Sequence, residues 1–303
     1  MSFDVTALST YVQNNSKPIA TKAVAGSKTA KLLIDNKQVQ VGVKGSANIL
    51  KMDADVTFQD GSTCGRSALG ATTLSDKQIT VKPIKDVQDF CPKSLYNTYF
   101  ATMIAQGQNP ENESMDAAFA ASIMEYRAAK VANAVEVILW QGDTASSNAN
   151  LNKFNGLLKQ ISTASDKIAL TETGADIIAK LQNIYTQMPV AVRKAQDFRI
   201  FIGEDMYDSY LIALAGKNIF KPTDDVTLFG TAAKLEVVPG LNGTNKIVAG
   251  KISDLQLGLD GTDDADRAVL KYSMETEKWY MDFHFAVGVA AVYTSQIGYV
   301  AFA

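Results

Sequence analysis

Few residues in this chain are of a type, and at a spacing, that would allow them to carry out catalysis. The single histidine, His284, follows Asp282 by two residues on the same face of an alternating segment. A histidine beside a carboxylate can serve acid–base catalysis. No serine or cysteine nucleophile stands near this pair in an elbow motif, so we interpret both residues as structural.

The cysteines and acidic runs do not match a known metal or phosphate site. Cys64 and Cys91 are not in a CxxC pattern, so a zinc site would need carboxylates for most of its ligands, and we expect two free thiols. The acidic run 260–266 lacks the order of an EF-hand and its terminal glutamate, which favours a solvated turn. The adjacent carboxylates Glu204 and Asp205 stand where they would cap a helix. We therefore predict no catalytic, cofactor-binding or metal-binding residues, and a protein that is not an enzyme.

The composition is typical of a globular protein. The 303 residues are 47% hydrophobic and 20% charged, which favours about two domains with a large core. A net charge of −3 argues against gross attraction to nucleic acid or anionic membranes. The first residues lack the pattern of a signal peptide, and no apolar run approaches the ~18 residues of a membrane span. We expect the chain to remain in the cytoplasm.

The longest segment with helical spacing is 113–141, and it predicts one helix about 43 Å long. Gly142 stands where a left-handed residue would end this helix. Two apolar stripes predict burial on two sides, so we expect a spine with a sheet on one side and a second lobe on the other. The stripes consist of Met115, Phe119, Ile123 and Tyr126, and of Met124, Ala128, Val131, Val135 and Ile138.

The N-terminal part predicts an extended arm followed by a projecting hairpin. Residues 1–35 are rich in small and polar types, so little of this arm can build a core. From Val39, short alternating runs predict a long β-hairpin with an open tip at 59–77. Leu69 and Leu74 are the only large apolar residues of that tip, so burial on its own chain cannot hold it in place.

The second half predicts a mixed lobe and a returning strand. Helical spacing over 173–188, the buried run 198–203 and a helix over 204–214 predict an α+β lobe. Apolar residues at every odd position from Trp279 to Tyr293 predict a long strand. We expect this strand to pair with the strand near Ile79, beside the spine.

The order of these parts resembles the major capsid protein of tailed bacteriophages, the Hong Kong 97-type fold. Four sequence segments and the spine carry this resemblance over nearly the whole chain. The segments are DVTFQDGSTCGRSALGATTLSDKQITVKPIKD, FRIFIGEDMYDSYLIAL, LFGTAAKLEVVPGLNGTNKIVAGKISDLQLGLD and VGVAAVYTSQIGYV.

The resemblance implies an α+β fold in five parts. They are an N-terminal arm (1–35), an extended hairpin loop with its base (36–88), a peripheral domain containing the spine (89–144), an axial domain (145–270) and a C-terminal strand that returns to the peripheral domain (271–303).

The resemblance also implies a self-assembling protein. Copies would form pentamers and hexamers and then an icosahedral shell around packaged double-stranded DNA, contacted non-specifically. Scaffolding, portal and decoration proteins would be partners, with no membrane and no cofactor. Assembly would take place in the host cytoplasm, and the product would be a virion capsid.

Two segments are candidate contacts between subunits. The hairpin tip would lie across the adjacent subunit, and the loop 216–230, which mixes aromatic and charged residues, would lie near the capsomer axis. The candidate residues are Asp60, Arg66, Leu69, Leu74 and Lys77 in the hairpin, and Lys217, Phe220, Lys221, Asp224, Asp225 and Phe229 in the loop.

Two other functions remain open at this point. An encapsulin-like nanocompartment has the same fold and would carry cargo protein in place of DNA. An α+β enzyme would require a small-molecule pocket and turnover.

Overall fold

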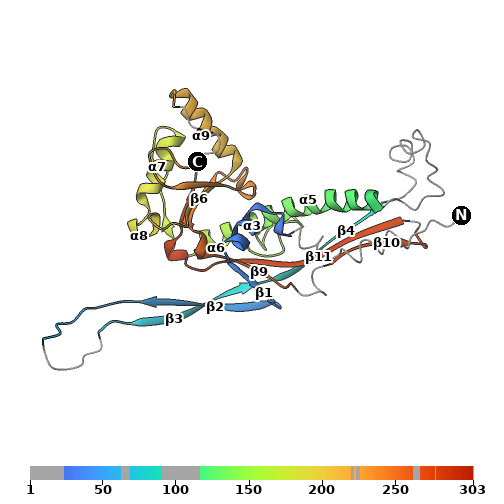
Figure 1. Ribbon diagram of the computed structural model, residues 1–303, viewed down its shortest axis with the longest axis horizontal. Helices are drawn as coiled ribbons and strands as arrows, with labels where there is room; N and C mark the ends of the chain where they lie inside the picture. Colours follow the sequence, from blue (N-terminus) through green and yellow to red (C-terminus); the bar gives the residue numbers. More distant parts are fainter. Residues whose placement is uncertain are drawn as a thin grey trace.

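The computed structural model describes residues 24–62, 69–90, 117–219, 222, 226–261, 267–276 and 278–302. The described residues form an elongated body, a compact lobe beside it and a hairpin that projects away from both (Figure 1). The body and the lobe each contain a five-stranded sheet, and the hairpin is a separate two-stranded sheet. The α+β class predicted from the sequence is confirmed.

The sheet of the body is built around one long strand, β11 (Lys278–Ala291). Its odd-numbered residues from Trp279 to Val289 are buried, which confirms the alternation predicted from the sequence. From Phe285 onward both faces are buried, because the hairpin base covers the face that carries Ala286 and Ala290. The other strands of this sheet are β1 (Val39–Val41), β4 (Lys82–Phe90), β9 (Leu255–Leu259) and β10 (Arg267–Ser273).

The pairing expected near Ile79 is wrong by one strand. Ile79 belongs to β3 (Thr72–Thr80), which pairs with β2 (Ser46–Ala54) to form the hairpin. The next strand, β4, is the one that pairs with β11, in antiparallel register. The chain crosses over β11 between β3 and β4, so Ile79 packs on the face of β11 against Ala290.

The spine is α5 (Ala117–Gln141), and the first four residues of the predicted helix lie outside the described part of the chain. One apolar stripe is confirmed, because Met124, Ala128, Val131, Val135 and Ile138 are all buried. The other stripe fails at Tyr126, which is 67% exposed and has the Lys130 amine 5.4 Å from its ring centroid. Of that stripe, Met115 and the side chain of Phe119 lie outside the described residues.

Gly142 ends the spine for a different reason from the one predicted. Its φ is not in the left-handed region. A Cβ on Gly142 would lie 2.5 Å from the carbonyl oxygen of Phe154 and 2.6 Å from that of Ile138. The residue is glycine because the following loop returns against the end of the helix at backbone contact distance.

The predicted arm contains a helix, α3 (Lys28–Asp35), which corrects the expectation of an extended segment up to residue 35. Ser27 caps it by accepting a hydrogen bond from the Ala30 amide, and Ala30 and Leu33 are fully buried. The Thr29 amide and hydroxyl donate to the two carboxylate oxygens of Glu136 on the spine, at 2.8 and 2.6 Å. The buried Leu33 and the hydrogen bonds of Thr29 therefore make this helix an integral part of the body. Residues 1–23 lie outside the described part.

The lobe is a sheet packed against helices. The expected strand and helix around 198–214 are confirmed as β6 (Phe198–Ile202) and α9 (Glu204–Gly216). The helix expected from 173 begins four residues later, as α7 (Ile177–Gln187), because Asp176 is its N-cap and accepts from the Ala179 amide at 2.8 Å. The remaining elements are β5 (Ile168–Ala169), β7 (Lys234–Val237), β8 (Lys246–Lys251), β12 (Gly298–Ala301), α6 (Leu157–Thr163), α8 (Val190–Arg193), η2 (Pro239–Leu241), η3 (Ile252–Asp254) and η4 (Thr294–Gln296).

Asp254 occupies the junction where the chain passes from the lobe sheet to the body sheet. It lies in η3, between β8 and β9, and its backbone oxygen accepts from the Val292 amide at 2.8 Å. Its side chain is buried, and Oδ2 has no hydrogen-bond partner among the described residues. Burial raises the pKa of Asp254 from 3.8 to about 6, although the Lys251 amine lies 3.6 Å from Oδ1.

We predict that Asp254→Asn flattens the pH dependence of stability. The raised pKa means that the folded state favours the protonated carboxyl, so this stabilisation is complete below pH 3.8 and is lost as pH rises through about 6. The total effect is up to about 3 kcal/mol. The Tm of the variant, measured between pH 4 and pH 8, should therefore rise relative to wild type as pH increases. A constant Tm difference across this range would contradict the prediction.

Candidate functional site

The two faces of the hairpin differ in what they contact. Ala47, Ile49 and Ile79 face inward and pack with Ala290 and Val292 at the end of the body sheet. The outward face carries exposed apolar side chains. These are Leu50, Met52 and Leu74, with Met52 directly opposite Leu74 in the strand register.

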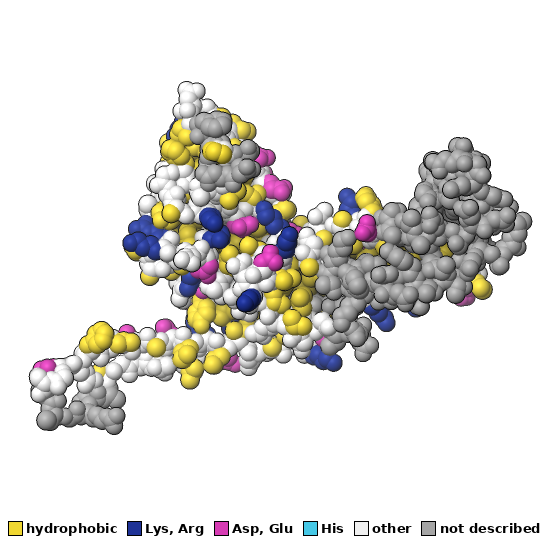
Figure 2. Space-filling model, in the orientation of Figure 1, with side chains coloured by type: hydrophobic (Ala, Val, Ile, Leu, Met, Phe, Trp, Pro, Cys, Tyr) yellow, Lys and Arg dark blue, Asp and Glu magenta, His cyan; other side chains and the backbone are white. Residues whose placement is uncertain are grey.

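Exposed apolar residues continue beyond the end of the paired strands. Val56, Phe58 and Leu69 are all exposed, and Phe58 is 94% accessible. Figure 2 shows hydrophobic side chains along the hairpin, away from the compact part of the molecule. Contiguous exposed apolar side chains of this kind mark interaction surfaces in soluble proteins.

The polar residues of the hairpin bond across its two strands. The Asn48 side-chain amide donates to Asp76 at 2.8 Å, and Gln78 donates to the Ser46 hydroxyl at 3.3 Å. A two-stranded hairpin is marginally stable alone, so contacts with another surface would favour its extended form.

The structure places the predicted hairpin residues along this projection. Asp60 accepts hydrogen bonds from the Ser62 hydroxyl and amide at 2.7 and 2.9 Å, and these bonds lower the pKa of its carboxyl. Leu69 and Leu74 are exposed, whereas Lys77 is half-buried opposite Ile49. Arg66 lies outside the described residues.

The two described loop candidates, Lys217 and Phe229, belong to the lobe, apart from the hairpin (Figure 1). Lys217 forms an ion pair with Asp176 of the same lobe. Phe229 is partly exposed, and its amide donates to the Tyr210 hydroxyl at 2.8 Å. The other four loop candidates, Phe220, Lys221, Asp224 and Asp225, lie outside the described residues.

Sequence reasoning missed four exposed residues of the hairpin, Leu50, Met52, Val56 and Phe58. It counted apolar residues only between 59 and 77. The missed signal is alternation, because these side chains occupy even positions between 50 and 58 while charged or polar residues occupy most of the odd ones. When alternate residues of a projecting strand are apolar, the face that they share indicates a surface that a partner covers.

The residues considered for catalysis make contacts that stabilise the fold. His284 pairs across strands with Arg267 and Lys85, and burial, followed by the charge of Arg267, lowers its pKa. Glu204 and Asp205 accept hydrogen bonds from the turn after η2, at 3.0 Å from the Asn242 side chain and 2.9 Å from the Gly243 amide. They hold this turn against the start of α9.

The described residues contain no group of three histidine, cysteine, aspartate or glutamate residues placed to hold a metal ion. Within the same residues, no helix has the length and apolar character needed to cross a membrane.

The combination of spine, side lobe, returning strand and long hairpin is the Hong Kong 97-type capsid fold. Solved structures with this architecture cover most of the chain. The satellite phage P4 procapsid matches with a TM-score of 0.61 at 11% identity, covering 94% of this chain and 89% of that one. The capsid of a native GTA particle matches with a TM-score of 0.55 at 10% identity, covering 89% of each chain.

A third solved structure of this fold is a virus-like particle from Pyrococcus furiosus. It matches with a TM-score of 0.52 at 13% identity, covering 96% of this chain and 99% of that one. No protein-family model and no curated protein sequence matches the chain. The likeness is therefore one of fold, preserved at very low sequence identity.

Proposed function

We propose that this chain is the major capsid protein of a tailed bacteriophage. Copies assemble into pentamers and hexamers, which form an icosahedral shell around the double-stranded DNA genome. The exposed apolar face of the hairpin is the observation that carries this proposal, because it lies on a projecting element that a second copy can cover. The fold shared with the P4 procapsid and the GTA capsid supports the proposal.

The energetics favour association through the hairpin. Burying one large apolar side chain stabilises a contact by about 1.5–3 kcal/mol. Leu50, Met52 and Leu74 together offer several times that amount before the entropy of association is subtracted. Each copy both presents a hairpin and receives one from a neighbour, and such head-to-tail contacts form rings when the rotation between copies closes.

The loop 216–230 lies near the axis of each capsomer, and scaffolding, portal and decoration proteins contact the shell during or after assembly. DNA is contacted without sequence preference. Assembly takes place in the host cytoplasm, without a membrane and without catalysis by this chain.

A cargo-carrying compartment of the encapsulin type is the second candidate. The likeness to the virus-like particle from Pyrococcus furiosus, which covers nearly all of that chain, is the observation in its favour. Particles purified from the native host decide between the two functions. Genome-length DNA inside supports the capsid, and a co-purifying enzyme without DNA supports the compartment.

We predict that the triple substitution Leu50→Ser, Met52→Ser and Leu74→Ser abolishes assembly without lowering the Tm of the subunit. These side chains contribute to contacts between copies and little to the fold, because they are exposed in the single chain. Sedimentation velocity measures assembly, and thermal unfolding of dissociated subunits measures stability.

Ile49→Ser is the matched control on the opposite face of the same strand. Ile49 is buried against the body, so this variant should lose stability. Wild-type yields of particles from the triple variant would contradict the role of the outward face.

A further inference from the structure

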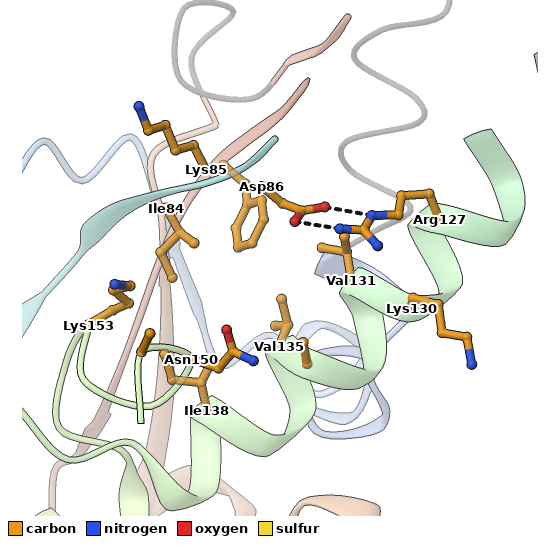
Figure 3. Close-up of a pocket in the computed structure, with 13 residues that line it drawn as sticks. Ile84, Lys85, Asp86, Arg127, Lys130, Val131, Val135, Ile138, Asn150 and Lys153 are labelled. Atoms are coloured by element: carbon orange, nitrogen blue, oxygen red, sulfur yellow. Dashed lines mark hydrogen bonds and ion pairs between the residues drawn. The ribbon is translucent and has the colours of Figure 1, made fainter. Parts of the chain in front are cut away.

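The hairpin projects from a firmly held base. Strand β4, which follows it, is held to the spine by two hydrogen bonds from Arg127 to Asp86, at 2.7 and 2.6 Å (Figure 3). On the other face of the body sheet, Ile49 and Ile79 pack with Ala290. These contacts fix where the hairpin begins. Its direction is a separate question, because a segment with few buried contacts can move relative to its base.

Lys51 and Lys77 stand at the boundary between the anchored base and the projection. Both lie on the inward face, because Lys77 is opposite Ile49 in the strand register and Lys51 follows Ile49 by two positions. Both are half-buried, whereas every described residue farther along the hairpin, 52–62 and 69–76, is exposed. The direction of the projection therefore depends on the surroundings of these two side chains.

Tyr293 provides the first contact for this boundary. It precedes η4, where the chain passes from the body sheet to the lobe sheet, and it packs against the cluster that holds the hairpin base. The Lys51 amine lies 5.4 Å from the centroid of the Tyr293 ring. A cation within about 6 Å of an aromatic centroid is attracted to the ring. Lys51 therefore connects the hairpin to the junction of body and lobe.

Asp166 provides a negative charge at the same junction. It lies between α6 and β5, and its Oδ1 accepts a hydrogen bond from the buried Thr294 hydroxyl at 2.6 Å. This bond is the main cause that lowers the pKa of Asp166, and the charges of Lys51 and Lys77 lower it further. The carboxylate is thus ionised at neutral pH and attracts both amines. The neighbouring Lys167 amine donates to two carbonyl oxygens of its own turn instead, at 2.7 and 3.0 Å.

We propose that Lys51 and Lys77 are positioning residues, which set the direction of the hairpin through Tyr293 and Asp166. They hold its inward face against the junction of body and lobe, and in the view of Figure 1 the hairpin passes below the lobe. A movement of the lobe relative to the body would move Asp166 and turn the hairpin with it. This tether acts within one chain, whereas its consequence for assembly rests on the proposed shell function.

The distance between a spin label on the hairpin and one on the lobe tests the tether. Suitable positions are Ala54→Cys at the end of β2 and Ala191→Cys in α8, both exposed, in a chain with Cys64→Ser and Cys91→Ser. Double electron–electron resonance on dissociated subunits then gives the distribution of distances. We expect one main distance, and a broader distribution when salt rises from about 0.1 to about 1 M, because salt screens these charges.

Charge reversal provides the second measurement. Lys51→Glu with Lys77→Glu, or Asp166→Lys alone, should raise the fraction of subunits outside the main distance by about fivefold. Combining the three substitutions restores opposite charges and should bring this fraction back towards the wild-type value. Lys31→Glu with Lys271→Glu is the matched control, because it changes the net charge equally at exposed positions of α3 and β10 and should leave the distribution unchanged.

The outcomes separate the tether from the shell function. Reversed variants that match the control, or a combined variant no narrower than either reversal, would overturn the tether and leave the packing of Ile49 and Ile79 as the cause of the direction. If a reversed variant does not fold, a wild-type distribution that salt leaves unchanged would overturn it equally. A tether found in wild-type subunits that never assemble would stand, while the shell function would not.

Discussion

Replacing Trp140 by alanine should lower the free energy of unfolding by about 3–5 kcal/mol, the largest loss that we expect from a single side chain. Trp140 is fully buried near the end of the spine, with its ring centroid 5.3 Å from that of Phe201 in the lobe. Its indole nitrogen donates to the Thr29 hydroxyl of α3 at 2.7 Å. One side chain thus connects the helix of the arm, the spine and the lobe.

Chemical denaturation of Trp140→Ala should show this loss. The variant also lacks the indole N–H that donates to Thr29, the residue that donates to the Glu136 carboxylate. Tyr126→Ala is the matched control, because it removes an exposed aromatic residue from the same helix and should change stability by less than about 0.5 kcal/mol. Equal losses in the two variants would show that the junction does not depend on Trp140.

Gly288→Ala should destabilise the chain by about 3 kcal/mol or more, because backbone occupies the space that a Cβ needs. A Cβ at this position would lie 2.0 Å from the Thr80 carbonyl oxygen and 3.0 Å from the Val81 Cα. Neither atom belongs to a flexible side chain that could move aside. The substitution would therefore push the hairpin base away from β11.

Gly216→Ala is the control for this substitution. Gly216 is the last residue of α9, and no atom lies within 4 Å of a Cβ built there. Alanine at 216 should leave Tm unchanged or raise it slightly, since it reduces the entropy of the unfolded chain. A Tm for Gly288→Ala close to that for Gly216→Ala would contradict the close crossing of β3 over β11.

Periodic segments were predicted well from the sequence. The alternation from Trp279 and the stripe from Met124 to Ile138 both arise from burial against one continuous surface, and such burial leaves a regular pattern in the residue types. The order of elements was sufficient to predict the fold, although the P4 procapsid, GTA capsid and virus-like particle chains are only 10–13% identical to this one.

Features that depend on contacts between distant segments were not predictable. The α3 helix is short, and it is held by burial of Ala30 and Leu33 and by hydrogen bonds to Glu136 and Trp140, more than 100 residues away. The pairing of β11 with β4 in place of β3 depends on the crossing that Gly288 permits. The alternation at Leu50 and Met52 is visible in the sequence, but which face of the hairpin stays exposed is a property of the folded projection.

Electron microscopy of the full chain, expressed alone and examined at increasing concentration, tests the central claim most directly. We expect capsomers, tubes or closed shells in which the hairpin of each copy lies across its neighbour, and only single subunits from the Leu50→Ser, Met52→Ser, Leu74→Ser variant. If wild type and variant alike remain single folded subunits at every concentration and salt condition, the protein is not a self-assembling shell protein.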